Sequence, residues 1–169
     1  GNISFTGNKA GTNGGAIDMG HMGGLELLDN TGSITFSDNT AVGIGGAIYT
    51  SCGEGVLIEN NTGDVTFRNN RAGSKAGAIY SGAYPNEIGL SIRNNGNVLF
   101  EKNAVADDAG NYILRSYQHN DDFPGGDVHL SAAAGKTIEF RDSIAGSFKL
   151  HLNEAYNGIA QTGDIIFTG

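Results

Sequence analysis

A phrase that recurs at a fixed interval is the feature of this 169-residue chain that most limits its fold. The segments "FTGNKAGTNGGAI", "FSDNTAVGIGGAI" and "FRNNRAGSKAGAI" begin at Phe5, Phe36 and Phe67, so each copy starts 31 residues after the one before. A repeat of this length is one supersecondary unit that cannot bury its apolar face alone. The sequence therefore predicts a solenoid in which equivalent residues of successive units lie in columns.

Each unit contains three short runs in which apolar and polar residues alternate. The first run holds the Phe, which returns at Phe100, Phe140 and Phe167, and the second holds the Ile that ends the phrase. The third run carries the apolar pairs Leu25 and Leu27, Val56 and Ile58, Leu90 and Ile92, and Val128 and Leu130. Alternating runs separated by Gly, Asn and Asp are typical of strands joined by turns. We expect an all-β fold, a right-handed parallel β-helix with three short strands per coil and about five coils.

The recurring residues have predictable places in such a coil. Phe and Ile should stack inside the rod, and the glycines should allow backbone conformations closed to other residues. In the fourth unit, Tyr112 takes the place of the Ile. An Asn follows the Phe by three positions in four units, and Ser143 stands there in the fifth. Stacked amides of this kind predict a ladder at one corner, formed by Asn8, Asn39, Asn70 and Asn103.

The charge and composition restrict the partners. A net charge of −8 makes nucleic acid and anionic membrane poor partners. No apolar stretch is long enough to cross a bilayer as a helix. The chain begins and ends within its pattern, so we expect a segment of a longer protein. It should form a single β-helix segment over 1–169, with regular repeats over 1–113 and degenerate coils with a long loop over 114–169.

The pairing of G-G-A-I at 14–17 and 45–48, and A-G-A-I at 76–79, with F-x-x-N resembles the repeats of the chlamydial polymorphic membrane proteins. The resemblance implies an autotransporter adhesin passenger that mediates attachment to host cells. It also implies a location at the bacterial surface, outer-membrane-attached or shed, with the membrane reached only through an outer-membrane barrel beyond this segment. We expect the motif residues to be mainly structural; they are Phe5, Asn8, Gly14, Gly15, Ala16, Ile17, Phe36, Asn39, Gly45, Gly46, Ala47, Ile48, Phe67, Asn70, Gly77, Ala78, Ile79, Phe100 and Asn103.

Extra length is confined to one part of the unit. The distance from the Ile position to the end of the third run is 10 residues twice (17 to 27, 48 to 58), then 13 (79 to 92) and 18 (112 to 130). These two insertions hold both prolines and several aromatic residues, so they predict a contact surface for a host cell-surface protein or glycan. The predicted contact residues are Tyr84, Pro85, Glu87, Arg115, Tyr117, His119, Asp121, Asp122 and Phe123. Idle surface loops are the alternative.

Residues capable of catalysis give a weak signal. Neighbouring residues of a strand point to opposite faces, so the pairs Asp107-Asp108 and Asp121-Asp122, with His119 and Arg115 nearby, predict solvated turns. His21, His119, His129 and His151 are scattered in the sequence and are interpreted as ordinary exposed side chains. We expect no catalytic residues, no metal site and no cofactor.

Three hypotheses remain at this stage. The first is an adhesin segment, and the second is a structural rod with homotypic association through its open ends. A polysaccharide-active β-helix enzyme is the third and least favoured.

Overall fold

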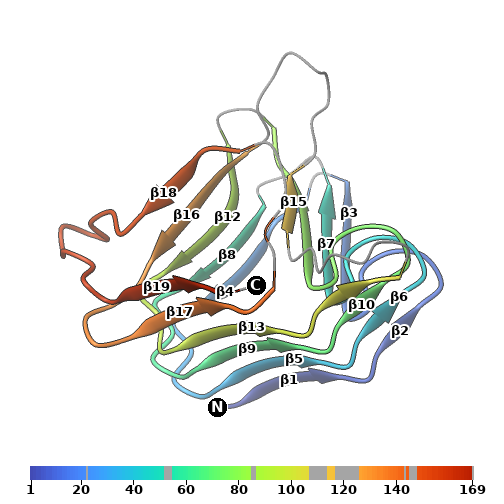
Figure 1. Ribbon diagram of the computed structural model, residues 1–169, viewed down its shortest axis with the longest axis horizontal. Coiled ribbons are helices and arrows are strands. Elements are labelled where there is room, and N and C mark those ends of the chain that lie inside the picture. Colours follow the sequence, from blue (N-terminus) through green and yellow to red (C-terminus); the bar gives the residue numbers. More distant parts are fainter. Residues whose placement is uncertain are drawn as a thin grey trace.

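The computed structural model is a stack of β-strands, and all pairings between the strands that it describes are parallel (Figure 1). It describes residues 1–21, 23–51, 55–84, 87–106, 126–142, 144 and 148–168, and the backbone alone of 114–116. The chain winds so that each strand pairs with the equivalent strand of the next coil. This arrangement confirms the parallel β-helix expected from the repeat.

The strands belong to four sheets, which follow one another around each coil. The first sheet contains the Phe strands β1 (Ile3–Thr6), β5 (Ile34–Ser37), β9 (Val65–Arg68), β13 (Val98–Glu101), β17 (Thr137–Phe140) and β19 (Asp164–Phe167). The second contains β2 (Lys9–Ala10), β6 (Thr40–Ala41), β10 (Arg71–Ala72) and β14 (Ala104–Val105). The third contains β3 (Ile17–His21), β7 (Ile48–Ser51), β11 (Ile79–Gly82) and β15 (Leu114–Ser116). The fourth contains β4 (Leu25–Leu28), β8 (Val56–Glu59), β12 (Ile88–Arg93), β16 (Asp127–Ser131) and β18 (Leu150–Leu152).

The second sheet adds a fourth strand to the three that the sequence predicts for each coil. Its strands are two residues long, too short to show the alternation by which strands are recognised in a sequence. Four complete coils of four strands are followed by β17, β18 and β19 within the described residues. Each complete coil therefore has four strands instead of the predicted three.

The strand register places the recurring residues in columns. Phe5, Phe36, Phe67, Phe100, Phe140 and Phe167 are successive partners in the first sheet. Ile17, Ile48 and Ile79 are partners in the third sheet. In the fourth coil the partner of Ile79 is Leu114, so the assignment of that place to Tyr112, which lies outside the described residues, was wrong. The insertion in the fourth unit hid this register in the sequence, and the strand pairing in the structure identifies the equivalent residue.

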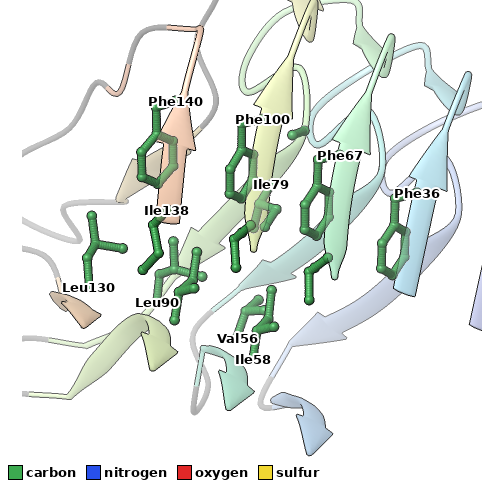
Figure 2. Packing of buried hydrophobic residues seen from close by; sticks show 14 of the residues in the cluster. Phe36, Val56, Ile58, Phe67, Ile79, Leu90, Phe100, Leu130, Ile138 and Phe140 are labelled. Carbon is green, nitrogen blue, oxygen red and sulfur yellow. The ribbon is translucent and has the colours of Figure 1, made fainter. Parts of the chain in front are cut away.

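Side chains from three of the sheets fill the interior. Figure 2 shows the rings of Phe36, Phe67, Phe100 and Phe140 stacked along one wall, with Ile and Leu side chains from other walls facing them. Centroids of neighbouring Phe36, Phe67 and Phe100 rings are 4.8 and 4.7 Å apart with interplanar angles of 1° and 2°. Each of these buried rings therefore packs on a ring above and a ring below, at the spacing of hydrogen-bonded strands.

One column of left-handed residues turns the chain out of the first sheet. Gly7, Asp38, Asn69 and Lys102 have φ angles of 69°, 58°, 56° and 57°. All four are exposed, and each directly precedes an Asn of the predicted ladder. The turn thus needs a left-handed backbone, while its side chain points away from the interior.

Candidate functional site

The Asn column after the first sheet forms a hydrogen-bonded ladder. The side-chain Oδ1 of Asn70 accepts from the backbone N (3.1 Å) and the Nδ2 (2.9 Å) of Asn39. The Nδ2 of Asn70 donates to Oδ1 of Asn103 (2.8 Å) and to the carbonyl O of Phe36 (3.0 Å). Asn39, Asn70 and Asn103 are fully buried. Every side-chain hydrogen-bonding group of Asn70 is therefore occupied within the protein.

The fifth coil ends this ladder with a carboxylate. Oδ2 of Asp142 accepts from the backbone N (2.9 Å) and Nδ2 (2.8 Å) of Asn103. Ser143, which the spacing assigned to this position, lies outside the described residues, and Asp142 occupies the place one residue earlier. The interval from the Phe to the ladder residue is three residues in the earlier coils and two in the fifth, so the spacing did not identify Asp142.

The glycines of the repeated phrase serve two different needs of the backbone. Gly45 has a φ of 70° in the left-handed region. Gly46 lies against the next coil, and a Cβ built there would be 2.0 Å from the carbonyl O of Gly77. A side chain at this position would overlap backbone that cannot move without separating the coils. Both glycines are buried; the space beside Gly45 is taken by Ile48 of the same coil, and that beside Gly46 by the next coil.

A second amide ladder, absent from the sequence-based expectations, lies after the fourth sheet. Oδ1 of Asn61 accepts from the backbone N of Asn30 (2.9 Å), and Oδ1 of Asn95 accepts from N (3.1 Å) and Nδ2 (2.8 Å) of Asn61. The signal in the sequence is Asn30, Asn61 and Asn95 at intervals of 31 and 34 residues. The chain therefore uses Asn at two corners, and both ladders are structural.

The insertions leave the coil between the third and fourth sheets. Measured by the observed register, this connection is longer than that of the second coil (48 to 58) by three residues in the third (79 to 92) and by six in the fourth (114 to 130). The backbone N of Asp127 donates to the carbonyl O of Glu87 (2.8 Å). The C-terminal ends of the two insertions therefore lie next to each other.

Few of the predicted contact residues lie in the part of the chain that the structure describes. Tyr84 is partly buried, Glu87 is exposed, and Oε2 of Glu87 accepts from the backbone N of Tyr84 at 3.3 Å. Arg115 lies on β15 opposite Tyr80. The other predicted contact residues fall outside the described residues; they are Pro85, Tyr117, His119, Asp121, Asp122 and Phe123. So do Asp107 and Asp108, which were weighed for catalysis.

Two of the histidines interpreted as scattered are in contact. His129 on β16 and His151 on β18 are register partners, and their rings stack with centroids 4.3 Å apart. Oε2 and Oε1 of Glu154 lie 3.0 Å from Nδ1 of His129 and 2.9 Å from Nδ1 of His151. Nε2 of His151 is 3.2 Å from Oδ2 of Asp127. The sequence hid this cluster because 22 residues separate the two histidines, which breaks the repeat interval.

The cluster is electrostatically coupled. The hydrogen bond to Glu154 raises the pKa of His151, and the bond to Asp127 adds to this effect against partial burial. Hydrogen bonds from His129 and then His151 lower the pKa of Glu154. One ligand atom from each of Asp127, His129 and His151 lies within 4.8 Å of the other two. Among the described residues, this is the group that could hold a metal ion.

A row of ion pairs crosses the outer face of the first sheet. Glu101 lies 2.9 Å from Nε of Arg68 and 2.7 Å from Nη1 of Arg141. The hydrogen bond from Arg141 lowers the pKa of Glu101, and the charges of Arg68 and Arg141 act in the same direction. Three coils are thus joined on the surface as well as in the core.

The described residues include no helix of the length and apolarity needed to cross a membrane. No curated protein and no solved structure matches the chain. Residues 2–18, 33–51 and 64–82 match the Chlamydia polymorphic membrane protein repeat. Each matched segment contains the Phe strand and the ladder Asn; the first two contain the glycine pair, which is Ala76-Gly77 in the third. The chain therefore carries three segments similar to this repeat, which together cover about a third of its length.

Proposed function

We propose that this chain is a non-catalytic, surface-exposed passenger segment that attaches a bacterial cell to host cells through the outside of its β-helix. The observation that carries this proposal is the repeat match itself, since the family is named for membrane proteins. The match covers the scaffold residues, which are engaged with neighbouring coils. A partner must therefore contact residues that the repeat does not specify.

The connection between the third and fourth sheets is the proposed contact surface. It is longer in the third and fourth coils than in the second, and the sheets on both sides of it continue through these coils. Loops held by a rigid scaffold are common binding sites, because they vary without disturbing the strands. The inserted Pro and aromatic residues are suited to a protein or glycan partner, since rigid aromatic side chains lose little entropy on binding.

Cell attachment by the purified chain tests this function. The fluorescently labelled chain is added to cultured epithelial cells, and saturable binding competed by unlabelled chain is expected. In the trimmed variant, residues 84–86 and 118–123 are deleted to match the length of the second coil. Its control is Gly11→Ala, a change at an exposed glycine whose Cβ would meet nothing within 4 Å.

The outcomes separate the two parts of the proposal. A trimmed protein that melts like the parent and no longer binds supports the insertion surface. If the trimmed protein binds as well as the parent, the contact surface is a flat face of the rod. A parent chain that binds no cells at any concentration contradicts attachment itself.

Self-association is a second candidate, favoured by the exposed apolar residues at one end of the stack. Leu150, Leu152 and Phe167 are 42%, 49% and 49% exposed. Ile3 and Phe5 occupy the opposite edge, where Phe5 is partly exposed. Equivalent positions at the two ends would let a second copy continue the columns head to tail.

Sedimentation at several concentrations tests this candidate. Oligomers that grow with concentration, and that Leu152→Glu abolishes, are expected if the ends pair. Val42→Glu is the control, since Val42 is 68% exposed and lies on the side of the coil after β6. A monomer at every concentration, or equal loss in both variants, contradicts end-to-end association.

A further inference from the structure

The outer face of the fourth sheet brings three metal-binding side chains together at its edge. Asp127 and His129 are alternate residues of β16, whose Val128 and Leu130 point into the core, so both lie on the outer face. His151 is the direct partner of His129 on β18, the edge strand of this sheet (Figure 1). The backbone thus fixes the positions of all three residues.

Glu154 determines which ring nitrogens face Asp127. A carboxylate can only accept, so each Nδ1 that contacts Glu154 carries a hydrogen. In a neutral imidazole the remaining nitrogen, Nε2, then carries the lone pair. A carboxylate that orients a histidine through its other nitrogen is the usual support of a metal-binding histidine. Glu154 gives this support to two histidines at once.

We propose that Asp127, His129 and His151 bind a Zn²⁺ ion, with Glu154 as the positioning residue. Two imidazole nitrogens and one carboxylate oxygen form a mixed ligand set that suits Zn²⁺ and related transition metals, whereas Ca²⁺ and Mg²⁺ prefer oxygen. The charges of Asp127 and Glu154 balance the two positive charges of the ion. The fourth position of a tetrahedral ion is left for water or for a group of a partner.

Metal binding requires both rings to rotate. The ligand atoms lie within 4.8 Å of one another, whereas Zn–N bonds of about 2.0–2.1 Å at tetrahedral angles bring two nitrogens to about 3.3 Å. Because the rings are stacked with an interplanar angle of 9°, their in-plane lone pairs run nearly parallel, and the side chains must turn away from stacking to direct them at one ion. The ion takes the place of the hydrogen that joins Nε2 of His151 to Asp127 at 3.2 Å.

The burial of the cluster fits a site that can be filled from solvent. The side chains of His129, Asp127 and His151 are 16%, 20% and 29% exposed. They are shielded enough to be ordered and open enough for an ion to enter. A bound ion would join β18 to β16, and so fasten the last coil to the one before it.

Calorimetric titration of Zn²⁺ into the chelator-treated chain tests the site at mildly alkaline pH. One bound ion and a rise in Tm are expected. His151→Gln and Asp127→Asn should each weaken binding on the order of 100-fold, and Glu154→Gln by about 10–100-fold as a lost support. His21→Gln, at an exposed histidine of β3, is the matched control and should bind like the parent.

Co²⁺ gives an independent readout on the unmutated chain. Its visible absorption should show the intensity of a four- or five-coordinate nitrogen and oxygen site, and Zn²⁺ should abolish it. Weak bands typical of octahedral hydrated Co²⁺ would overturn the proposal, as would the absence of saturable Zn²⁺ binding. Equal binding by parent, His151→Gln and Asp127→Asn chains would also overturn it and assign the ion to another place. Because no cells are used, this result is separate from that of the attachment assay.

Discussion

Asp142 accepts two hydrogen bonds from Asn103 through a single oxygen, Oδ2, at 2.9 Å from the backbone N and 2.8 Å from Nδ2. Asn39, Asn70 and Asn103 accept in the same way from the coil before, and their Nδ2 atoms also donate to the coil after. A carboxylate side chain can only accept. The ladder therefore has a direction, and a carboxylate belongs only at its last position.

The direction of the ladder predicts unequal losses of stability for two reverse substitutions, Asn70→Asp and Asp142→Asn. Asn70→Asp removes the donor to Asn103 and Phe36 and places acceptor atoms against acceptor atoms in a buried corner. Leaving one buried partner unbonded costs about 1–3 kcal/mol, and the free energy of unfolding should fall by more than this. Asp142→Asn keeps the accepting oxygen and should change stability much less. Denaturant titration of both variants measures the difference. Equal losses would contradict a directional ladder.

The stacked rings predict a large loss of stability when a ring in the middle of the rod is removed. Phe67→Ala removes a fully buried ring that contacts Phe36 and Phe100, and should lower the free energy of unfolding by about 3–5 kcal/mol. Phe167→Ala, at a ring that is 49% exposed, is the control and should cost clearly less. Thermal melts of the two variants at the same pH compare them. An unchanged melt for Phe67→Ala would rule out its place in the core.

The close approach of two coils predicts that Gly46 tolerates no side chain. In Gly46→Ala the Cβ would lie 2.0 Å from the Gly77 carbonyl, and relief requires the coils to separate. Stability should fall by about 3 kcal/mol, the upper range for overpacking. Gly11→Ala, where a Cβ meets nothing within 4 Å, should be nearly neutral. If both variants unfold at the same denaturant concentration, the close contact does not exist in solution.

The lowered pKa of Glu101 predicts a stability difference that depends on pH. A carboxyl whose pKa is lower in the folded chain than in the unfolded chain stabilises the fold above its ordinary pKa. This contribution is lost as the pH falls through the lowered folded value. Glu101→Gln should therefore lower Tm at neutral pH, and the gap to the parent should close in strong acid.

Melts of parent and Glu101→Gln from neutral to strongly acidic pH check this expectation. Glu26→Gln, at an exposed carboxylate of β4, is the control and should show a much smaller gap. A gap for Glu101→Gln that stays constant across the whole range would mean that the ion pairs with Arg68 and Arg141 contribute nothing.

Residues that repeat with an unbroken interval could be placed from the sequence. The columns of Phe67 and Ile48 follow from the 31-residue spacing, because a parallel β-helix stacks equivalent residues. The short strand at Arg71–Ala72 did not follow, since two residues show no alternation. In the fourth coil the insertion hid the register, and Leu114 took the place assigned to Tyr112.

The candidate metal site shows the limit of sequence spacing more clearly. His129 and His151 lie opposite each other in space, but the shortened fifth coil gives them an interval of 22 residues where the repeat has 31. Glu154 joins them from a turn that follows β18. Three-dimensional proximity of this kind depends on the length of each coil, which the repeated phrase does not encode. The insertion residues Tyr84 and Glu87 were assigned to the correct connection, and their contact role stays a prediction.

The residues of the left-handed column differ in charge. Gly7 has no side chain, Asp38 is acidic, Asn69 is neutral and Lys102 is basic. The turn requires the left-handed backbone angle, and the side chains of Asp38, Asn69 and Lys102 are exposed, with Nδ2 of Asn69 donating to Oδ1 of Asp38 at 3.2 Å. This edge therefore presents one exposed position per coil, about 4.8 Å apart, at which residues of different charge occur while the interior stays the same. Substitution or chemical labelling at these positions would therefore change the surface without changing the packing of the core.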